Sequence, residues 1–392
     1  MIKRSVCLLV FTLLLLCSCT QGVPSDSDER LMTGVTGGVL DATVTLVDPV
    51  VKYIIDVAFI GAEAFSAFED AYNLAQRASG TEKESFSMLA QALDQYMEDE
   101  NRVVPQEFFD NIQSLSFWYL ADILSARIQF YTPHSNSDYA HVPIANESTI
   151  DSLEDFVHMR NLAQLEVGSS TISDFAPLQS LSKLESLHVR TSETVFVESL
   201  AQLTTLKVLS VNCDNIRNLE QLGELESLVD LSLFNAVIED LTFLSGLVRL
   251  EHLRLDSCSI AHLDGISPLA GLTRLSLPNS NIQDITAISS LPSLRWLDLT
   301  GNGIVKLIPI SDLNNLTHLY LSNNAITDLS PLSEMRDLVE LYLESNEISD
   351  ITPLAEMTAL RYLNVSDNQI DDFAPLSELI DLEVILREGN PG

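Results

Sequence analysis

Residues 338–354 read LVELYLESNEISDITPL, and this run decides the fold. Aliphatic and other residues alternate in its first half, which predicts a strand that buries one face. Pro353 stands in its second half at the point where a short helical turn would begin. The run therefore predicts a strand, a bend and a helical segment within one small unit.

The same pattern recurs every 22 residues without slippage. A second framework leucine follows the first by three residues, and Val or Leu follows it by five. A single unit cannot bury these side chains, but stacked units can. The spacing predicts a solenoid over residues 140–392, and the first leucines of its coils are Leu162, Leu184, Leu206, Leu228, Leu250, Leu272, Leu294, Leu316, Leu338, Leu360 and Leu382.

Asparagine follows the strand at one fixed offset in the later units, at Asn302, Asn324, Asn346, Asn368 and Asn390. An inward asparagine there can bond the backbone groups that the bend leaves unpaired. The same position holds smaller or less suitable residues in the earlier units, at Ser170, Ser192, Asp214, Ala236, Cys258 and Ser280. We therefore expect the N-terminal coils to be less regular than the C-terminal ones.

A turn of the form Ile-x-Asp recurs at Ile282/Asp284, Ile326/Asp328, Ile348/Asp350 and Ile370/Asp372. With this turn, the unit resembles the 22-residue leucine-rich repeat of the internalin type, over about residues 150–392. The resemblance implies an α/β solenoid: a curved right-handed superhelix with a concave parallel sheet, a convex side of short 3-10 or helical segments, and a role in protein binding at surfaces. The sequence shows no C-terminal wall-sorting motif, so an anchor is expected at the N-terminus.

Residues 1–18 are interpreted as a lipoprotein signal peptide. A positively charged start precedes the apolar residues 6–16, which are too few to span a bilayer comfortably. The LCSC motif that follows resembles the bacterial lipobox, in which Cys19 becomes the lipidated N-terminus. The alternative is a plain secretory signal with incidental cysteines. In either case the mature chain would lie outside the cytoplasm, which excludes an intracellular regulator of the phosphatase-binding leucine-rich-repeat type.

Residues 19–30 are polar and predict a tether, and residues 31–139 carry no repeat. Apolar residues in the latter follow helical spacing, among them Phe108, Ile112, Leu115, Ile123, Leu124 and Ile128. This predicts a small helical domain that caps the first coil. An amphipathic helix lying on a membrane is the alternative. Half a repeat then precedes the regular run, at Ile150, Leu153, Phe156 and Met159, so the junction is placed near residue 140.

The charge argues against nucleic-acid binding, and the lack of catalytic motifs argues against enzyme activity. The formal net charge is −35, whereas nucleic-acid binding needs basic residues. No catalytic motif is found, the histidines are scattered, and we expect no enzyme activity, no cofactor and no metal site. Cys213 and Cys258 lie two coils apart, beyond disulfide reach, and are interpreted as free thiols. The aspartates of the Ile-x-Asp turns could bind a cation, but a local turn or capping role is favoured.

The outward positions of the strands are where function would lie, because the leucines are committed to the core. They predict an aromatic strip on the concave sheet, with arginines at one edge: Arg254, Arg274, Trp296, His318, Tyr320, Tyr342 and Tyr362. Exposed aromatics and arginine dominate binding hot spots. The alternative is that strands simply favour aromatic residues.

The sequence therefore predicts a monomeric envelope protein, lipid-anchored to a membrane and exposed to the periplasm or the cell exterior. It would bind a protein partner through its concave face, in adhesion or in contact with a host or neighbouring cell. A non-catalytic structural or scaffolding envelope protein is the alternative. A third hypothesis, an enzyme built from residues 31–139, lacks any nucleophile–base set.

Overall fold

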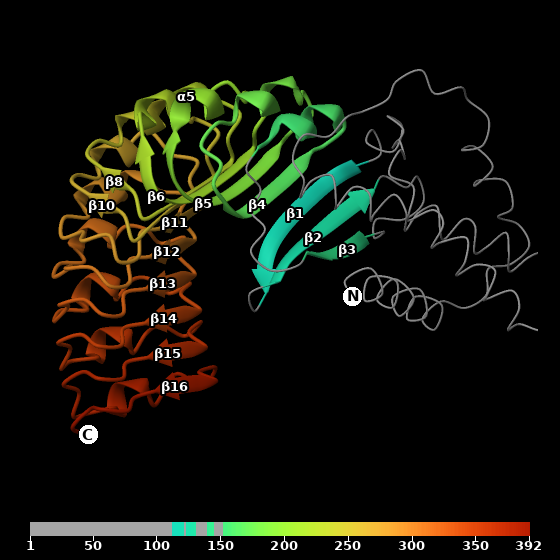
Figure 1. Cartoon of the computed structure of the whole chain (residues 1–392). Helices are drawn as coiled ribbons and strands as arrows, with labels where there is room; N and C mark the ends of the chain where they lie inside the picture. Colours follow the sequence, from blue (N-terminus) through green and yellow to red (C-terminus); the bar gives the residue numbers. More distant parts are fainter. Residues whose placement is uncertain (1–111, 121–122, 131–138, 145–151) are drawn as a thin grey trace, which may run out of the picture.

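The computed structural model describes residues 112–120, 123–130, 139–144 and 152–392. Within this part of the chain, coils of 22 residues stack into a curved solenoid (Figure 1). Each coil places a strand on the inner side of the curve and a helical segment, usually 3-10, on the outer side. The predicted solenoid with a concave parallel sheet is confirmed.

One sheet of 14 strands runs through the molecule, in the order β16-β15-β14-β13-β12-β11-β9-β7-β6-β5-β4-β1-β2-β3. The neighbours from β4 to β16 are parallel, and their framework leucines lie opposite one another, as Leu319, Leu341 and Leu363 do. These strands are β4 (Gln164–Ser170), β5 (Ser186–Phe196), β6 (Val208–Arg217), β7 (Asp230–Phe234), β9 (His252–Asp256), β11 (Arg274–Ser276), β12 (Trp296–Asp298), β13 (His318–Tyr320), β14 (Glu340–Tyr342), β15 (Tyr362–Asn364) and β16 (Val384–Leu386).

The outer side consists mainly of short 3-10 segments, as the resemblance implied. They are η1 (Glu154–His158), η2 (Ala176–Ser180), η3 (Leu219–Glu224), η4 (Thr242–Gly246), η5 (Asp264–Ile266), η6 (Thr286–Ser290), η7 (Ile308–Ile310), η8 (Ser330–Leu332), η9 (Thr352–Leu354) and η10 (Ala374–Leu376). One coil has a single α-helical turn instead, α5 (Val197–Leu200). Two short strands, β8 (Val237–Ile238) and β10 (Ser259–Ile260), form a separate two-stranded sheet.

The framework side chains form one continuous hydrophobic core. Leu338, Leu341 and Leu343 are 0% exposed, as are Ile348 and Leu354 from the second half of the same coil. Burying one such side chain contributes about 1.5–3 kcal/mol. Each coil makes these contacts only with its neighbours, so its stability depends on the stack. The half-repeat predicted before the first full coil is buried in the same way at Leu153, Phe156 and Met159.

The asparagine column bonds the backbone as predicted. The Asn346 amide nitrogen donates to the carbonyls of Leu321 at 3.0 Å and Leu343 at 2.9 Å. Its side-chain oxygen accepts from the Ile326 N–H at 3.0 Å. Each asparagine therefore joins its own coil to the preceding one, and it satisfies polar groups that would otherwise be buried unpaired.

Smaller residues take the asparagine position in the earlier coils and bond less. The Ser280 hydroxyl donates to the Leu255 carbonyl at 2.9 Å, whereas the Cys258 sulfur lies 3.6 Å from the Leu233 carbonyl. Ala236 has no polar side-chain atom. The earlier strands are also longer, and the pairing of β5 with β4 and with β6 contains register shifts. The expectation of less regular N-terminal coils is confirmed.

A left-handed residue precedes the asparagine position in each regular coil. Its φ lies between +53° and +77°, and the residues are Asn235, Ser257, Asn279, Gly301, Asn323, Ser345, Asp367 and Gly389. Asn, Asp and Gly tolerate this conformation best. At Gly301 a Cβ would lie 2.1 Å from the Asn279 side-chain oxygen, so any other residue here would displace the Asn279 side chain.

Turn aspartates cap the 3-10 segments. Asp350 accepts from the Thr352 N–H at 2.8 Å, and Asp328 accepts from the Ser330 N–H at 2.8 Å. Asp174, Asp240, Asp284 and Asp372 do the same in their coils. This is the local capping role that the sequence favoured. The positions adjoining the segments on their N-terminal side are apolar, as at Leu329 before Ser330 and Ile351 before Thr352.

The helical prediction is wrong for the part of residues 31–139 that the structure describes. Residues Ile112–Leu120 form β1 and Ile123–Phe130 form β2, and β3 (Tyr139–Ile144) follows. β1 pairs in parallel with β4 and antiparallel with β2, so these strands extend the solenoid sheet across the predicted junction near residue 140. The signal peptide, the tether and most of the predicted cap domain lie outside the described residues.

The two cysteines of the solenoid are buried and form no disulfide, as predicted. Burial raises the pKa of the Cys258 thiol to about 11, so the thiol is protonated and unreactive at neutral pH. Within the described residues, none of the helices has the length and apolarity that crossing a membrane requires.

Candidate binding surface

Two columns of side chains point outward from the concave sheet, on either side of the buried leucines. Arg274, Trp296 and His318 are direct neighbours in the first column, since β11, β12 and β13 pair in register. Tyr320 and Tyr342 are neighbours in the second column, on β13 and β14. The constant 22-residue spacing brings these residues together from separate coils.

A continuous run of rings crosses between the two columns. The centroids of Trp296 and Tyr320 are 5.2 Å apart, and those of Tyr320 and Tyr342 are 4.8 Å apart with an interplanar angle of 14°. The Arg274 guanidinium lies 4.7 Å from the Trp296 centroid, in cation–π contact. We call these four residues the aromatic strip. Its three rings are partly exposed and Arg274 is exposed, so the strip forms an accessible surface.

Glu340 holds the strip in place from the neighbouring strand. The Tyr320 hydroxyl donates to its carboxylate at 2.7 Å, and His318 Nε2 lies 3.7 Å from its other oxygen. Burial and this hydrogen bond raise the pKa of the Tyr320 hydroxyl above its usual range. The hydroxyl therefore stays protonated, and the hydrogen bond holds the ring in one orientation. A ring that is already ordered loses less entropy when a partner binds.

The other predicted residues lie beside the aromatic strip rather than in it. Arg254 lies over the Phe234 ring at 5.1 Å and pairs with Asp256 at 2.5 Å, two strands before the Trp296 ring. The Tyr362 hydroxyl donates to Glu383 at 3.4 Å. Arg274 therefore lies against the strip, whereas Arg254 forms its own small cluster.

A shallow groove of about 430 Å³ lies along the strip, and it contains residues that the sequence reasoning missed. Its lining comprises His252, Thr273, Arg274, Arg295, Trp296, Thr317, His318, Tyr320 and Glu340. Arg295 directly precedes β12, a position outside the two columns read from the sequence. Glu340 lies in the first column, but only its hydrogen bond with Tyr320 shows that it positions the strip.

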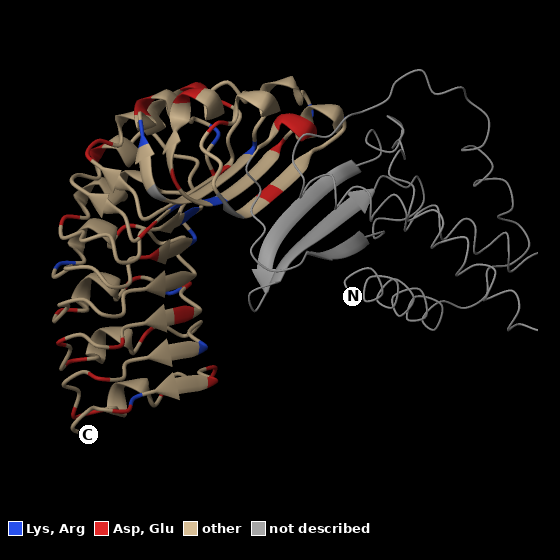
Figure 2. Ribbon diagram, in the orientation of Figure 1, with Lys and Arg blue, Asp and Glu red and all other residues tan. Residues whose placement is uncertain are grey.

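The charge around the groove differs from that of the molecule. Acidic residues follow the whole stack of coils (Figure 2). Arg274 and Arg295 form no ion pair within the described part of the chain, where the pairs found are Lys207–Glu185, His252–Asp230, Arg254–Asp256, His318–Glu340, Arg336–Glu334 and Arg361–Glu383. Two guanidinium groups line the groove, and that of Arg274 lies over the Trp296 ring, so the groove offers hydrogen-bond donors and flat apolar area to a partner.

The polar side chains of the surface bond to neighbouring groups. No group of three or more His, Cys, Asp or Glu side chains that could hold a metal ion is found among the described residues. The Tyr320 hydroxyl donates to Glu340 at 2.7 Å, and the nearby hydroxyl of Thr317 donates to the Arg295 carbonyl at 3.0 Å. These groups are engaged in positioning neighbours.

Comparison with known proteins agrees with the repeat. Residues 248–304 match the family model described as leucine-rich repeat, and residues 314–356 match the model described as two copies of leucine-rich repeats. These matches identify leucine-rich repeats within the two ranges. No curated protein matches it.

Several solved structures share the fold. An internalin from Listeria monocytogenes (inlF) is 27% identical, with a TM-score of 0.61, and the match covers 77% of this chain and 82% of that one. A leucine-rich-repeat protein from Leptospira interrogans is 23% identical with a TM-score of 0.51, covering 61% and 70%. A plant peptide hormone receptor, RGFR1 in complex with RGF2, is 23% identical with a TM-score of 0.51, covering 61% and 42%. The last two show the fold alone, and the first adds structural similarity to an internalin.

Proposed function

We propose that this chain is a lipid-anchored cell-envelope protein that binds a protein partner through its concave face, in adhesion or in contact with a host or neighbouring cell surface. The observation that supports it is the aromatic strip: Trp296, Tyr320 and Tyr342 stack in an accessible row although the core has no need of them. The similarity to an internalin supports the same class of function. The plant peptide hormone receptor with the same fold was solved in complex with RGF2, which is in keeping with a binding role.

The strip has the composition of an interface centre. Large aromatic residues and arginine are enriched among residues whose truncation costs more than about 2 kcal/mol of binding free energy. Here they are already held by stacking and by Glu340. A partner therefore meets a surface that needs little further ordering.

The test is a double substitution in the strip. We expect Trp296→Ala with Tyr342→Ala to weaken partner binding at least about 100-fold, because two central anchors are lost. The partner is first identified by photo-crosslinking from a probe placed at His318. Affinity is then measured by titrating the purified pair, while thermal melting checks that the variant folds.

A matched control lies on the other side of the coil. Val305→Ala with Ile308→Ala also removes two exposed large side chains, which are 50% and 68% exposed. This control should bind normally. Equal affinities of the strip variant and the control would rule out the concave strip as the binding surface.

A structural or scaffolding envelope protein is the second candidate. Val384, Ile385 and Leu386 of β16 are 39%, 37% and 49% exposed, although Ile385 occupies a framework position. An exposed apolar end of this kind favours packing against another component. Under this alternative, Trp296→Ala with Tyr342→Ala leaves the association with the other envelope component unchanged, whereas Ile385→Asp abolishes that association.

Anchoring through Cys19 is proposed from the lipobox alone, since this residue lies outside the described part. We expect mass spectrometry of the mature chain to find a diacylated or triacylated N-terminal cysteine at Cys19. Replacement of Cys19 by Ser should release the protein from the membrane fraction, whereas replacement of Cys17 should leave it there. An unmodified N-terminus elsewhere would indicate a plain secretory signal instead.

A further inference from the structure

Backbone hydrogen bonds join successive coils on the outer flank as well as in the concave sheet. In the later coils the N–H after the asparagine position bonds the preceding coil, as in Gly303 N–H to Ile282 C=O at 2.9 Å and Ala325 N–H to Ile304 C=O at 3.0 Å. In the earlier coils β8 and β10 pair there, with Ser259 N–H to Ala236 C=O at 2.9 Å.

This outer ladder is interrupted between β10 and the next coil. The regular series would join the Asn281 N–H to the Ile260 C=O, but neither group has a hydrogen bond among the residues that the structure describes. Asn279 and Asn281 both have positive φ, +54° and +57°. The other coils have one left-handed residue at this turn, so the extra one marks the place where the ladder stops.

The same two coils stay joined on the concave side. The Arg274 N–H bonds the Glu251 carbonyl at 3.0 Å, and the Ser257 N–H bonds the Pro278 carbonyl at 2.9 Å. The coils therefore separate only on the outer flank. The result is a cleft with an unpaired backbone acceptor, Ile260 C=O, on one wall and an unpaired donor, Asn281 N–H, on the other.

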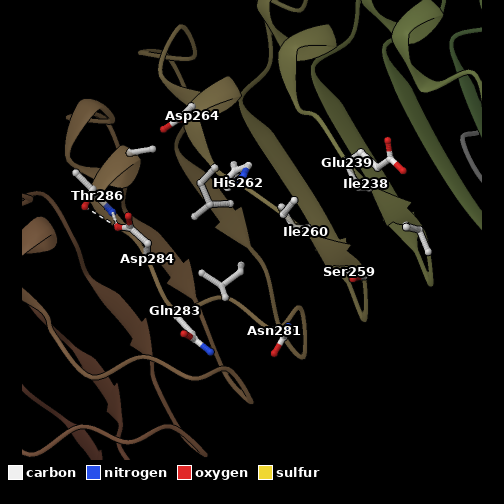
Figure 3. Close-up of a pocket in the computed structure, with 15 residues that line it drawn as sticks. Ile238, Glu239, Ser259, Ile260, His262, Asp264, Asn281, Gln283, Asp284 and Thr286 are labelled. Carbon is white, nitrogen blue, oxygen red and sulfur yellow. Dashed lines mark hydrogen bonds between the residues drawn. The ribbon is translucent and has the colours of Figure 1, made fainter.

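The cleft has a volume of about 680 Å³, which is within the usual range of ligand sites. Figure 3 shows its labelled side chains coming from three consecutive coils, on both sides of the gap between β10 and residues 281–284. Ile260, Leu263 and Ile282 form an apolar floor and are only 4–7% exposed. The floor thus resembles the surface that a third strand of the β8–β10 sheet would cover.

The rim of the cleft is acidic. Glu239, Asp264 and Asp284 line it, and His262 is its one basic lining residue. Glu239 and Asp264 form no ion pair within the described residues. The hydrogen bonds from Thr286 hold the pKa of the Asp284 carboxyl below its usual range, so this carboxylate is ionised at neutral pH. A cationic side chain is therefore the complementary group.

The unpaired Ile260 carbonyl and Asn281 N–H favour a peptide over a small cation as the ligand of the cleft. A simple amine would leave the Ile260 carbonyl and the Asn281 N–H unpaired. An extended chain carries both donors and acceptors along its edge, and it can add to a sheet edge as β-strands do in peptide-binding domains. Strand addition also places alternate side chains over the floor and at the rim.

We propose that the cleft between β10 and residues 281–284 binds an extended peptide segment that carries Lys or Arg. The segment adds to the β10 edge as a third strand, covers Ile260 and Ile282, and places its cation among Glu239, Asp264 and Asp284. This site lies on the opposite flank from the aromatic strip and is independent of it.

The test uses the full-length chain and a defined probe, the blocked peptide acetyl-Thr-Lys-Val-Lys-Thr-amide, titrated by calorimetry. We expect saturable binding in the millimolar range. The same peptide N-methylated at valine, which cannot donate one strand hydrogen bond, should bind about fivefold more weakly. Glu239→Gln with Asp264→Asn should weaken the unmodified peptide by about fivefold or more.

Controls separate this site from general acidity and from the concave face. Glu347→Gln with Glu356→Gln removes two exposed carboxylates from a regular coil and should leave the affinity unchanged, as should Trp296→Ala with Tyr342→Ala. The inference is overturned if the probe does not bind, or if acetyl-Thr-Glu-Val-Glu-Thr-amide binds equally well. It is also overturned if n-butylammonium or the N-methylated peptide matches the probe, since the site would then take a cation without strand pairing.

Discussion

At the scale of single residues, the inward asparagines contribute as much to the architecture as the leucines do. Asn346 is 8% exposed and bonds four backbone groups, in its own coil and the preceding one. An apolar residue of similar size would fill the space, but it would leave the Ile326 N–H unpaired and remove one of the two asparagine bonds to the Leu321 and Leu343 carbonyls. The penalty for such unpaired buried groups is about 1–3 kcal/mol each.

We expect Asn346→Ala to destabilise the protein by about 2 kcal/mol, because the buried Ile326 N–H loses its partner and the Leu321 and Leu343 carbonyls each lose one of two asparagine bonds. Asn346→Ser should cost less, since Ser280 retains a bond to the preceding coil in the same position. Urea denaturation followed by circular dichroism measures both. Thr327→Ala, at an exposed neighbouring position, is the control, and an equal midpoint for Asn346→Ala and Thr327→Ala would contradict the prediction.

The sequence predicted the asparagine column but not the residue before it. Gly301, Asn323, Ser345 and Asp367 share a left-handed conformation that a search for aliphatic spacing does not detect. Their types carry a signal, because Gly, Asn and Asp favour positive φ. Ser345 does not carry this signal, because serine has no preference for positive φ. The coils on both sides hold Ser345 in this conformation.

At the scale of elements, the 3-10 segments depend on the turn aspartates. The hydrogen bond from the Thr286 hydroxyl, with that from its backbone N–H, lowers the pKa of the Asp284 carboxyl. Ser330 and Thr352 lower the pKa of Asp328 and Asp350 in the same way. Because the folded pKa is below the unfolded one, these carboxylates stabilise the fold above the unfolded value of about 3.9. The contribution is lost as the pH falls through the lower folded pKa.

The triple variant Asp284→Asn, Asp328→Asn and Asp350→Asn should therefore flatten the acid dependence of stability. Asparagine still accepts the capping hydrogen bonds but carries no charge. We expect the wild-type chain to melt at a higher temperature than the variant at pH 6, and the two to converge near pH 2. Thermal melts across this range provide the measurement, and an unchanged difference at low pH would exclude the carboxylates as its source.

The mistaken helix at residues 112–128 has a physical explanation. Apolar residues three or four apart, such as Ile112 and Leu115, match a helix in a short window. The stretch Ser114-Leu115-Ser116-Phe117 also alternates, which is a strand signal. The pairing of β1 with β4 resolves the ambiguity, and those partners are about 50 residues apart in sequence. Spacing within a short window cannot predict a contact between strands so far apart in sequence. A repeat of constant length, by contrast, predicts which of its strands lie side by side.

At the scale of the whole molecule, the constant register made the aromatic strip predictable. Trp296 and Tyr320 lie on different coils, yet the absence of insertions fixes which strand positions become neighbours. The contact between Tyr320 and Glu340 and the groove position of Arg295 depend on side-chain directions, which the repeat does not encode. The interruption beside β10 also escaped prediction, because the 22-residue spacing continues through it unchanged.

Stacking in one dimension has a mechanical consequence. Each coil is held only by its neighbours, through the sheet, the core and the asparagine bonds, so tension applied at β16 loads one junction at a time. We expect optical tweezers to record successive small extensions rather than a single rupture. Each detached coil would release 22 residues, or about 75 Å of contour length. Abrupt release of the whole array in one event would show instead that the coils yield together under load.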